Sequence, residues 1–188
     1  MTSNHLEQML AAHCAPTLLG AKCASLMSLS KEQFDDIPSL AELYSRRFSA
    51  CGLCFQVVCD CGCRSLLLVY RPALLRARLQ RADVAALLHR QGYPLRESLE
   101  AQLAFLRARL ARKRAFPHEI GLFLGYPPAD VACFIRTGGA GCKLSGYWKV
   151  YTDVDAARET FACYDACRAC LQHVLASGQT ISQLLCAA

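Results

Sequence analysis

Two cysteines and one histidine have the residue types needed for metal binding or nucleophilic catalysis. Cys14 follows an apolar segment and comes shortly before a proline. Cys142 follows the flexible stretch TGGAG and precedes Lys143, whose ammonium group would lower the pKa of a neighbouring thiol. If His118 lies near both cysteines, two soft sulfur atoms and one imidazole can bind a transition metal such as zinc or iron, or form a Cys-His nucleophilic pair. Alternatively, each cysteine is a small buried hydrophobic side chain, which is the commoner fate of a free cysteine.

His118 and Glu119 stand side by side in the stretch FPHEIGLFLGYPPADV, residues 116–131. Pro117 is suited to the first position of a helix, so both residues would lie in a first turn with unpaired backbone N–H groups. The helix dipole favours a glutamate there and disfavours a protonated imidazole, so a neutral His118 could bind a metal or accept a proton. Alternatively, His118 bonds a loop carbonyl and Glu119 only caps the helix. The predicted catalytic residues are Cys14, His118, Glu119 and Cys142.

Aromatic and basic residues near these positions could line a cleft. The stretch GYWKVYT, residues 146–152, is rich in aromatic side chains, and Tyr126 adds another. Ligand pockets are commonly lined by aromatic side chains with a few polar groups at fixed positions. The predicted substrate-binding residues are Lys22, Tyr126, Trp148 and Lys149. The alternative is that these aromatic residues belong to the core.

Two further groups of cysteines are dense enough to hold a metal. The stretch CGLCFQVVCDCGC, residues 51–63, has five thiols, but no second CxxC pair or histidine pair completes a known zinc module. The stretch CYDACRAC, residues 163–170, has the C-x3-C-x2-C spacing that holds an iron–sulfur cluster in radical S-adenosylmethionine enzymes. Its thiols fall on one face of a predicted helix, in a chain too short for the barrel that this chemistry uses. We therefore favour a structural role for both groups.

The composition excludes several classes of protein. The chain has 188 residues, of which 54% are apolar and 19% charged, which is typical of one globular domain over residues 1–188. No apolar run approaches the roughly 18 residues of a membrane span, and Glu7 stands where a secretion signal needs a basic start. Thirteen cysteines without an export signal indicate thiols or metal ligands in a reducing compartment. We therefore expect a cytoplasmic protein with no membrane partner.

The net charge of +6 comes mostly from arginine, and part of it lies in RARLARKR, residues 107–114. A basic cluster of this kind can bind nucleic acid. However, no aromatic residue interrupts the arginines, and basic residues in the last turn of a helix are favoured by its dipole. We expect a helix end rather than a nucleic-acid site.

The hydrophobic pattern predicts an α+β fold. Helices are predicted at residues 3–12, 38–48, 72–80, 83–91, 95–113, 117–125, 128–136, 153–176 and 180–185. Strands are predicted at 22–29, 52–59, 64–70 and 146–152. A turn through Asp60 and Gly62 joins the second and third of these strands in a hairpin. Because helical blocks of unequal length separate the strands, we expect a single domain with a small mixed sheet packed against several helices.

Three long stretches together resemble a known family: HCAPTLLGAK (13–22), FPHEIGLFLGYPPADV (116–131) and CKLSGYWKVYTD (142–153). They are similar to the uncharacterised bacterial family catalogued as domain of unknown function 3793, which is found largely in anaerobic Firmicutes and their relatives. The resemblance covers nearly the whole chain. It implies no established activity, but it does imply a genomic association with flavodoxin or iron-related genes. The chain departs from the usual pattern in its extra cysteines, including Cys23.

Two hypotheses on function follow. The first is a metal- or thiol-dependent enzyme of redox or iron physiology, with a site formed where the three stretches meet. The second is a non-catalytic binding module, for example an accessory partner of flavodoxin, because an acidic protein attracts a chain of net charge +6. A pocket enclosed by the three stretches would favour the first hypothesis, and an open surface would favour the second.

Overall fold

The computed structural model describes residues 2–112 and 116–186. Its helices are α1 (Thr2–His13), α2 (Ala15–Leu18), α3 (Ile37–Arg47), the 3-10 turn η1 (Ser49–Cys51), α4 (Pro72–Leu79), α5 (Ala82–Arg90), α6 (Leu99–Leu110), α7 (Ile120–Phe123), α8 (Pro128–Thr137), α9 (Val154–Ala176) and α10 (Ile181–Cys186). Its strands are β1 (Ala24–Ser30), β2 (Cys54–Cys61), β3 (Arg64–Tyr70), β4 (Leu144–Ser145) and β5 (Lys149–Val150). The predicted α+β class is confirmed.

The three-stranded sheet has the order β1-β3-β2, and β2 and β3 form the predicted hairpin. Its central strand, RSLLLVY, is nearly continuous in apolar residues because both of its faces are covered. Leu67 and Val69 pack on one side, and Leu68 packs on the other. Successive side chains of a strand point to opposite faces, so this one strand contributes to two separate cores.

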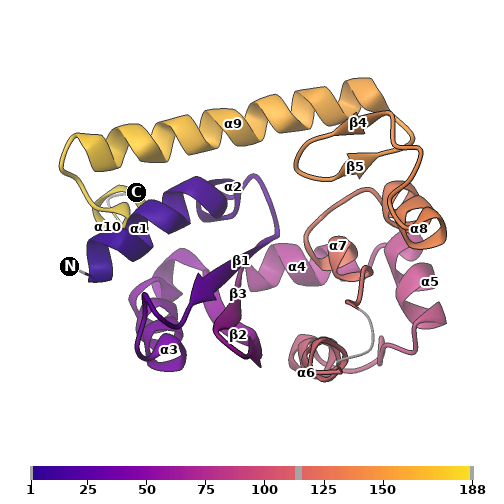
Figure 1. Cartoon of the computed structure of the whole chain (residues 1–188), viewed down its shortest axis with the longest axis horizontal. Coiled ribbons are helices and arrows are strands. Elements are labelled where there is room, and N and C mark those ends of the chain that lie inside the picture. Colours follow the sequence, from indigo (N-terminus) through magenta and orange to yellow (C-terminus); the bar gives the residue numbers. More distant parts are fainter. Residues whose placement is uncertain (1, 113–115, 187–188) are drawn as a thin grey trace.

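Each face of the sheet carries its own hydrophobic cluster. One cluster joins the sheet to α1, α2, α3 and the C-terminal half of α9, and the other joins it to α4 through α8. Figure 1 shows α9 running along one whole side of the molecule, from the β4–β5 hairpin to the region of α1 and α10. Asp153 caps this helix by accepting a hydrogen bond from the N–H of Ala156 at 3.0 Å, as its sequence position predicted. The C-terminal half of this helix packs in the first cluster, and its Phe161 contacts Trp148 of the β4–β5 hairpin.

Several predicted elements differ from the structure. Every strand pair in the described residues is antiparallel, so the sheet is not mixed. The strand predicted at 146–152 is reduced to two residues, which pair with β4 in a separate small sheet. The helix predicted to start at Pro117 starts at Ile120, and the one predicted from residue 95 starts at Leu99, where Ser98 is the cap. The predicted end of that helix at residue 113, and the last residues of the basic stretch, lie outside the described residues.

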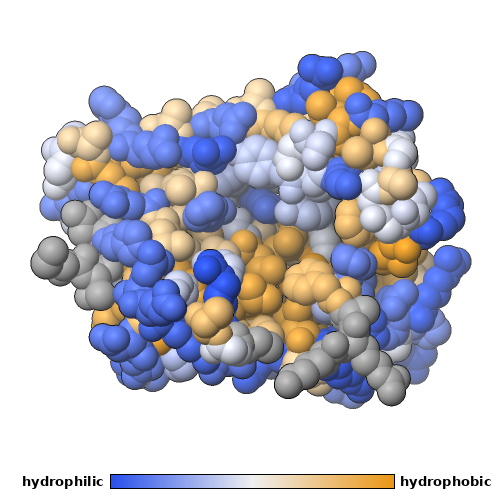
Figure 2. All heavy atoms as spheres, viewed as in Figure 1, coloured by the Kyte–Doolittle hydropathy of each residue, from blue (hydrophilic) through white to orange (hydrophobic). Residues whose placement is uncertain are grey.

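Apolar side chains also reach the surface. Figure 2 shows hydrophobic residues gathered in the middle of the face drawn, with hydrophilic residues around them. The large hydrophobic side chains that are exposed include Leu74 on α4, Phe116 and Ile135. Within the described chain, none of the helices has both the length and the apolar character that crossing a membrane requires.

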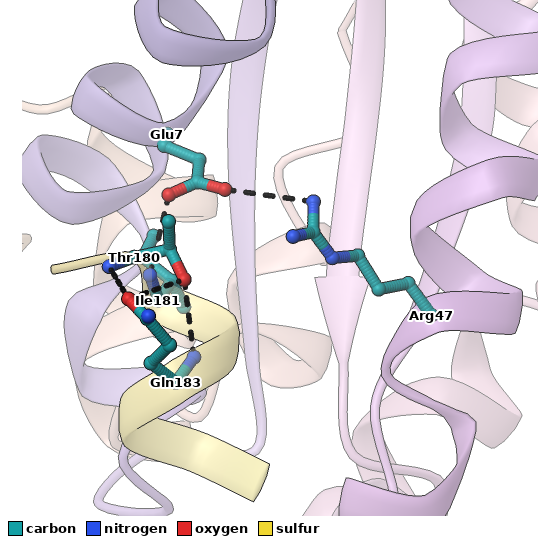
Figure 3. A network of polar contacts seen from close by, with 5 residues as sticks. All are labelled: Glu7, Arg47, Thr180, Ile181 and Gln183. Carbon is teal, nitrogen blue, oxygen red and sulfur yellow. Dashed lines mark hydrogen bonds and ion pairs between the residues drawn. The ribbon is translucent and has the colours of Figure 1, made fainter.

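Glu7 is a buried carboxylate that ties the two ends of the chain together. Its Oε2 accepts a hydrogen bond from the N–H of Ile181 at 3.2 Å, at the start of α10. Its Oε1 lies 3.6 Å from an amino group of Arg47, at the end of α3 (Figure 3). The residue that argued against a secretion signal in the sequence thus has a structural role in joining α1, α3 and α10.

Replacing Glu7 with alanine should lower the free energy of unfolding by about 1–2 kcal/mol, because α10 loses a buried acceptor and Arg47 loses its counter-charge. Urea denaturation measures this change. Glu42→Ala is the matched control, because it breaks the exposed Glu42–Arg46 pair and should change stability by less than about 0.5 kcal/mol. Equal losses in the two variants would contradict the role assigned to Glu7.

Candidate functional site

One cavity of about 210 Å³ lies between α7, α8, the β4–β5 hairpin and strand β1. Most of its lining is apolar, with Leu26 from β1 and Phe134 from α8 among the contributors. Three of the four predicted substrate-binding residues line it, namely Tyr126, Trp148 and Lys149. Two of the three long sequence stretches therefore meet at this cavity, which we call the aromatic pocket.

Asp130 fixes the position of one wall of the aromatic pocket. It lies in the first turn of α8, and the residue is only 2% exposed. Its Oδ2 accepts a hydrogen bond from Trp148 Nε1 at 2.8 Å. Its Oδ1 accepts from the N–H of Tyr151 at 2.9 Å, and from the N–H and hydroxyl of Thr152 at 3.0 and 2.9 Å. Four donors satisfy this buried charge, so the tryptophan is held in one orientation.

The aromatic wall is packed on both sides. The rings of Tyr126 and Trp148 stack with centroids 5.3 Å apart, and Phe161 of α9 meets the tryptophan edge-on at 4.6 Å. Gly146 permits this arrangement, because a Cβ at that position would collide with the ring of Phe161. Gly121 allows a second close approach, because a Cβ at that position would lie about 3.0 Å from Val131 and 3.1 Å from Tyr126.

His118 lies at the mouth of the aromatic pocket. Its ring contacts Phe134 edge-on, with centroids 4.9 Å apart, and lies 5.9 Å from the ring of Phe116. The side chain is exposed, and it sits in a turn before α7 rather than inside a first helical turn. The dipole argument for a neutral imidazole therefore does not apply, but the imidazole does face the cavity.

The two predicted lysines occupy different surroundings. Lys149 lines the aromatic pocket and donates a hydrogen bond from Nζ to the carbonyl of Gly139 at 2.8 Å. Lys22 does not line this pocket. Its Nζ lies 5.2 Å from the ring centroid of Tyr126 and 5.6 Å from that of Tyr164. Burial lowers the pKa of Lys22 to about 8.

Glu119 is not part of the aromatic pocket. It is 3% exposed, forms an ion pair with Arg109 at 2.5 Å and accepts a hydrogen bond from Tyr93 at 3.1 Å. Burial and the neighbouring carboxylate together raise the pKa of that tyrosine, with burial the larger cause. The carboxylate therefore joins α6 to the turn before α7, and the prediction of Glu119 as a catalytic residue is replaced by this structural role.

Cys14 is a core residue. It is fully buried between α1 and α2, and its Sγ lies 3.6 Å from the sulfur of Met27. Burial raises its pKa to about 12, and nearby Lys22 offsets this only in part. A thiol of this pKa is protonated at neutral pH, so it is a poor nucleophile and a poor metal ligand. The alternative of a small buried hydrophobic side chain fits the structure.

The predicted metal ligands do not meet. Cys142 is half-buried in the loop between α8 and β4 and does not line the aromatic pocket. Among the described residues, no three histidine, cysteine, aspartate or glutamate side chains are grouped so that they could hold a metal ion. Cys14, His118 and Cys142 therefore do not form a zinc or iron centre. The same finding applies to the described cysteines of the 51–63 and 163–170 stretches.

Comparison with protein-family models matches residues 10–185 to "Protein of unknown function (DUF3793)". The chain belongs to this family. Searches among curated proteins and among solved structures found no match. The family implied by the sequence motifs is thus confirmed, and the site of this DUF3793 member must be interpreted from its own geometry.

Asp130 is the residue of this DUF3793 chain that sequence reasoning missed. It lies within the stretch 116–131 that carried the family resemblance, directly after two prolines and an alanine. An acidic residue in a first helical turn is usually explained by the helix dipole alone. A signal was nevertheless present, because Asp130 is the only acidic residue between Glu119 and Asp153 in a segment rich in hydrogen-bond donors.

Asp130→Asn should lower the free energy of unfolding by about 2–3 kcal/mol, because an amide presents a donor where both carboxylate oxygens now accept hydrogen bonds. Trp148 is the one tryptophan of the chain, so its emission should move to longer wavelength as the indole loses its anchor. Fluorescence and urea denaturation measure both effects. Asp155→Asn, an exposed change in the first turn of α9, is the control. Unchanged emission in Asp130→Asn would contradict the anchoring role.

Alkylation with iodoacetamide tests the burial of Cys14. In mildly alkaline buffer the exposed Cys63, Cys163 and Cys170 should react in the native protein. Cys14 should react only after urea is added, because its ordinary pKa near 9 is restored on unfolding. Mass spectrometry of peptides identifies the modified thiols. Rapid native labelling of Cys14 would restore it as a candidate nucleophile.

Proposed function

We propose that this protein binds a small, largely apolar molecule of one or two rings in the aromatic pocket. The mostly apolar cavity of about 210 Å³ is the observation that carries the proposal. Engineered apolar cavities of roughly 150 Å³ accept benzene, so this volume suits a single ring or a compact fused pair. Tyr126 and Trp148 contribute aromatic side chains to its lining.

Polar groups at the pocket define what else the ligand carries. The carboxylate of Asp130 already accepts four hydrogen bonds, so a cationic ligand gains little from it. Lys149 uses one hydrogen bond on Gly139, and an ammonium group has three donors in total. His118 adds a further polar group at the mouth. The pocket therefore favours a neutral ring compound with an acceptor group directed at Lys149 or His118.

The geometry favours binding over catalysis by a metal or a thiol. His118 faces the pocket without a carboxylate partner, because Glu119 is engaged with Arg109. Cys14 is buried elsewhere and Cys142 lies outside the pocket. We place this activity in the cytoplasm, where a reducing environment keeps thiols from forming disulfides. The role as an accessory partner of flavodoxin stays a prediction, supported by the net charge of +6.

Ligand-observed NMR with phenol, indole and quinoline tests the proposal. Wild-type protein should show saturation transfer to at least one of these compounds. Val131→Phe, which fills the cavity, should abolish the transfer. His118→Asn should weaken binding several-fold with little change in the thermal midpoint, because the imidazole is exposed and makes few stabilising contacts.

His89→Asn is the matched control, since His89 is exposed on α5 and does not line the aromatic pocket. It should bind as the wild type does. Circular dichroism should confirm that each variant is folded. Equal transfer in wild type and Val131→Phe would show that the probes bind elsewhere. A lower midpoint in His118→Asn with unchanged binding would leave this histidine with a structural role.

A further inference from the structure

We propose a second binding site, for the phosphate group of a small organic phosphate monoester, in the depression formed by Lys22, Arg78 and Arg81. This depression has a volume of about 510 Å³ and lies where the segment before β1 meets α4. We call it the basic pocket. It shares no lining residue with the aromatic pocket, so this inference does not rest on the function proposed above.

Lys22 is the first reason for the assignment. The residue is only 8% exposed, yet within the described parts of the chain its ammonium forms neither an ion pair nor a hydrogen bond. The rings of Tyr126 and Tyr164 lie against the ammonium and interact weakly with a cation, and the thiols of Cys14 and Cys23 are also near. A buried charge without a counter-charge destabilises the fold, so an apolar residue would serve stability better. A bound anion would supply the missing partner.

Arg78 provides a second unsatisfied donor in the same depression. One of its terminal amino groups donates to the carbonyl of Tyr126 at 2.5 Å, which holds the side chain in place. Its Nε is buried and has no hydrogen-bond partner. Burial lowers the pKa of Arg78, and the neighbouring charge of Arg81 lowers it further. Lys22 and Arg78 therefore come from different segments of the chain and line one depression.

Arg81 completes a set of three cations. It is exposed just before α5 and forms an ion pair with Asp83 at 2.8 Å. Three positive groups with one carboxylate leave a net positive pocket. A phosphate monoester carries up to two negative charges and several acceptor oxygens, so it can bind an ammonium and a guanidinium group at once.

The remaining lining indicates that the phosphate belongs to an organic molecule. Leu74, Ala77 and Tyr164 also line the pocket, and the leucine side chain is 42% exposed. Gly20 and Gly125 contribute backbone without side chains, both with φ near +80°. The space exceeds what one phosphate group needs. An apolar or aromatic substituent can therefore lie against Tyr164 and Leu74 while the phosphate contacts the cations.

Thermal unfolding with inorganic phosphate, phenyl phosphate and phenol tests this proposal, with sodium chloride at matched ionic strength as reference. Both phosphates should raise the midpoint of the wild type, and phenyl phosphate should bind several-fold more tightly than inorganic phosphate. Lys22→Met should weaken both affinities at least tenfold, and Arg81→Gln should weaken them several-fold. Without phosphate, the midpoint of Lys22→Met should equal or exceed that of the wild type.

Arg76→Gln is the matched control, because Arg76 lies on the same helix but lines a different depression. It should bind phosphate as the wild type does, and so should the filled-cavity variant Val131→Phe. Loss of phosphate binding in Val131→Phe would place the phosphate in the aromatic pocket and overturn the assignment. A rise of the midpoint with phosphate that is no larger than the rise with sodium chloride would also overturn the assignment. The same holds if Lys22→Met binds phosphate as tightly as the wild type does. Equal affinity for inorganic phosphate and phenyl phosphate would contradict the assignment of an organic monoester as the ligand.

Discussion

The buried carboxylate of Asp130 is the interaction on which the site depends. It joins the first turn of α8 to the segment that leads from β5 into α9, and it fixes the indole of Trp148. The hairpin that carries Trp148 has only two residues in each strand, so strand pairing alone holds it weakly. The carboxylate adds to this weak strand pairing by accepting hydrogen bonds from two backbone N–H groups and two side chains. Because α9 begins directly after this segment, the same contacts also position the start of that helix.

Three buried charged residues show how differently the fold treats such groups. Asp130 has four donors, and Glu119 has an arginine and a tyrosine hydroxyl. Lys22 has no hydrogen bond or ion pair within the described residues. A buried charge whose hydrogen bonds are all made within the fold needs no ligand. A buried charge without such partners would be stabilised by a bound ligand of opposite charge. This contrast separates Asp130 and Glu119, which have structural roles, from Lys22, which we assign to binding.

The sequence predicted those features that depend on local pattern. The 52–70 hairpin and the helix that starts after Asp153 follow from spacing within a few residues. The meeting of Cys14, His118 and Cys142 depended on packing between distant segments, which spacing does not encode, and it did not occur. Cys14 instead follows the apolar face of α1 into the core. The strand predicted at 146–152 is interrupted because residues 146–148 form the turn of the β4–β5 hairpin, where the alternation of aromatic residues suggested an extended chain.

The nitrogen–proton correlation spectrum of the indole of Trp148 tests the central claim most directly, because one tryptophan gives one indole signal. If Asp130 holds Trp148 as the wall of a binding pocket, this proton should exchange with water far more slowly than that of free indole. The signal should also shift on addition of a ring compound that enters the aromatic pocket. A rapidly exchanging indole proton, or a signal unmoved by every such compound, would contradict the account.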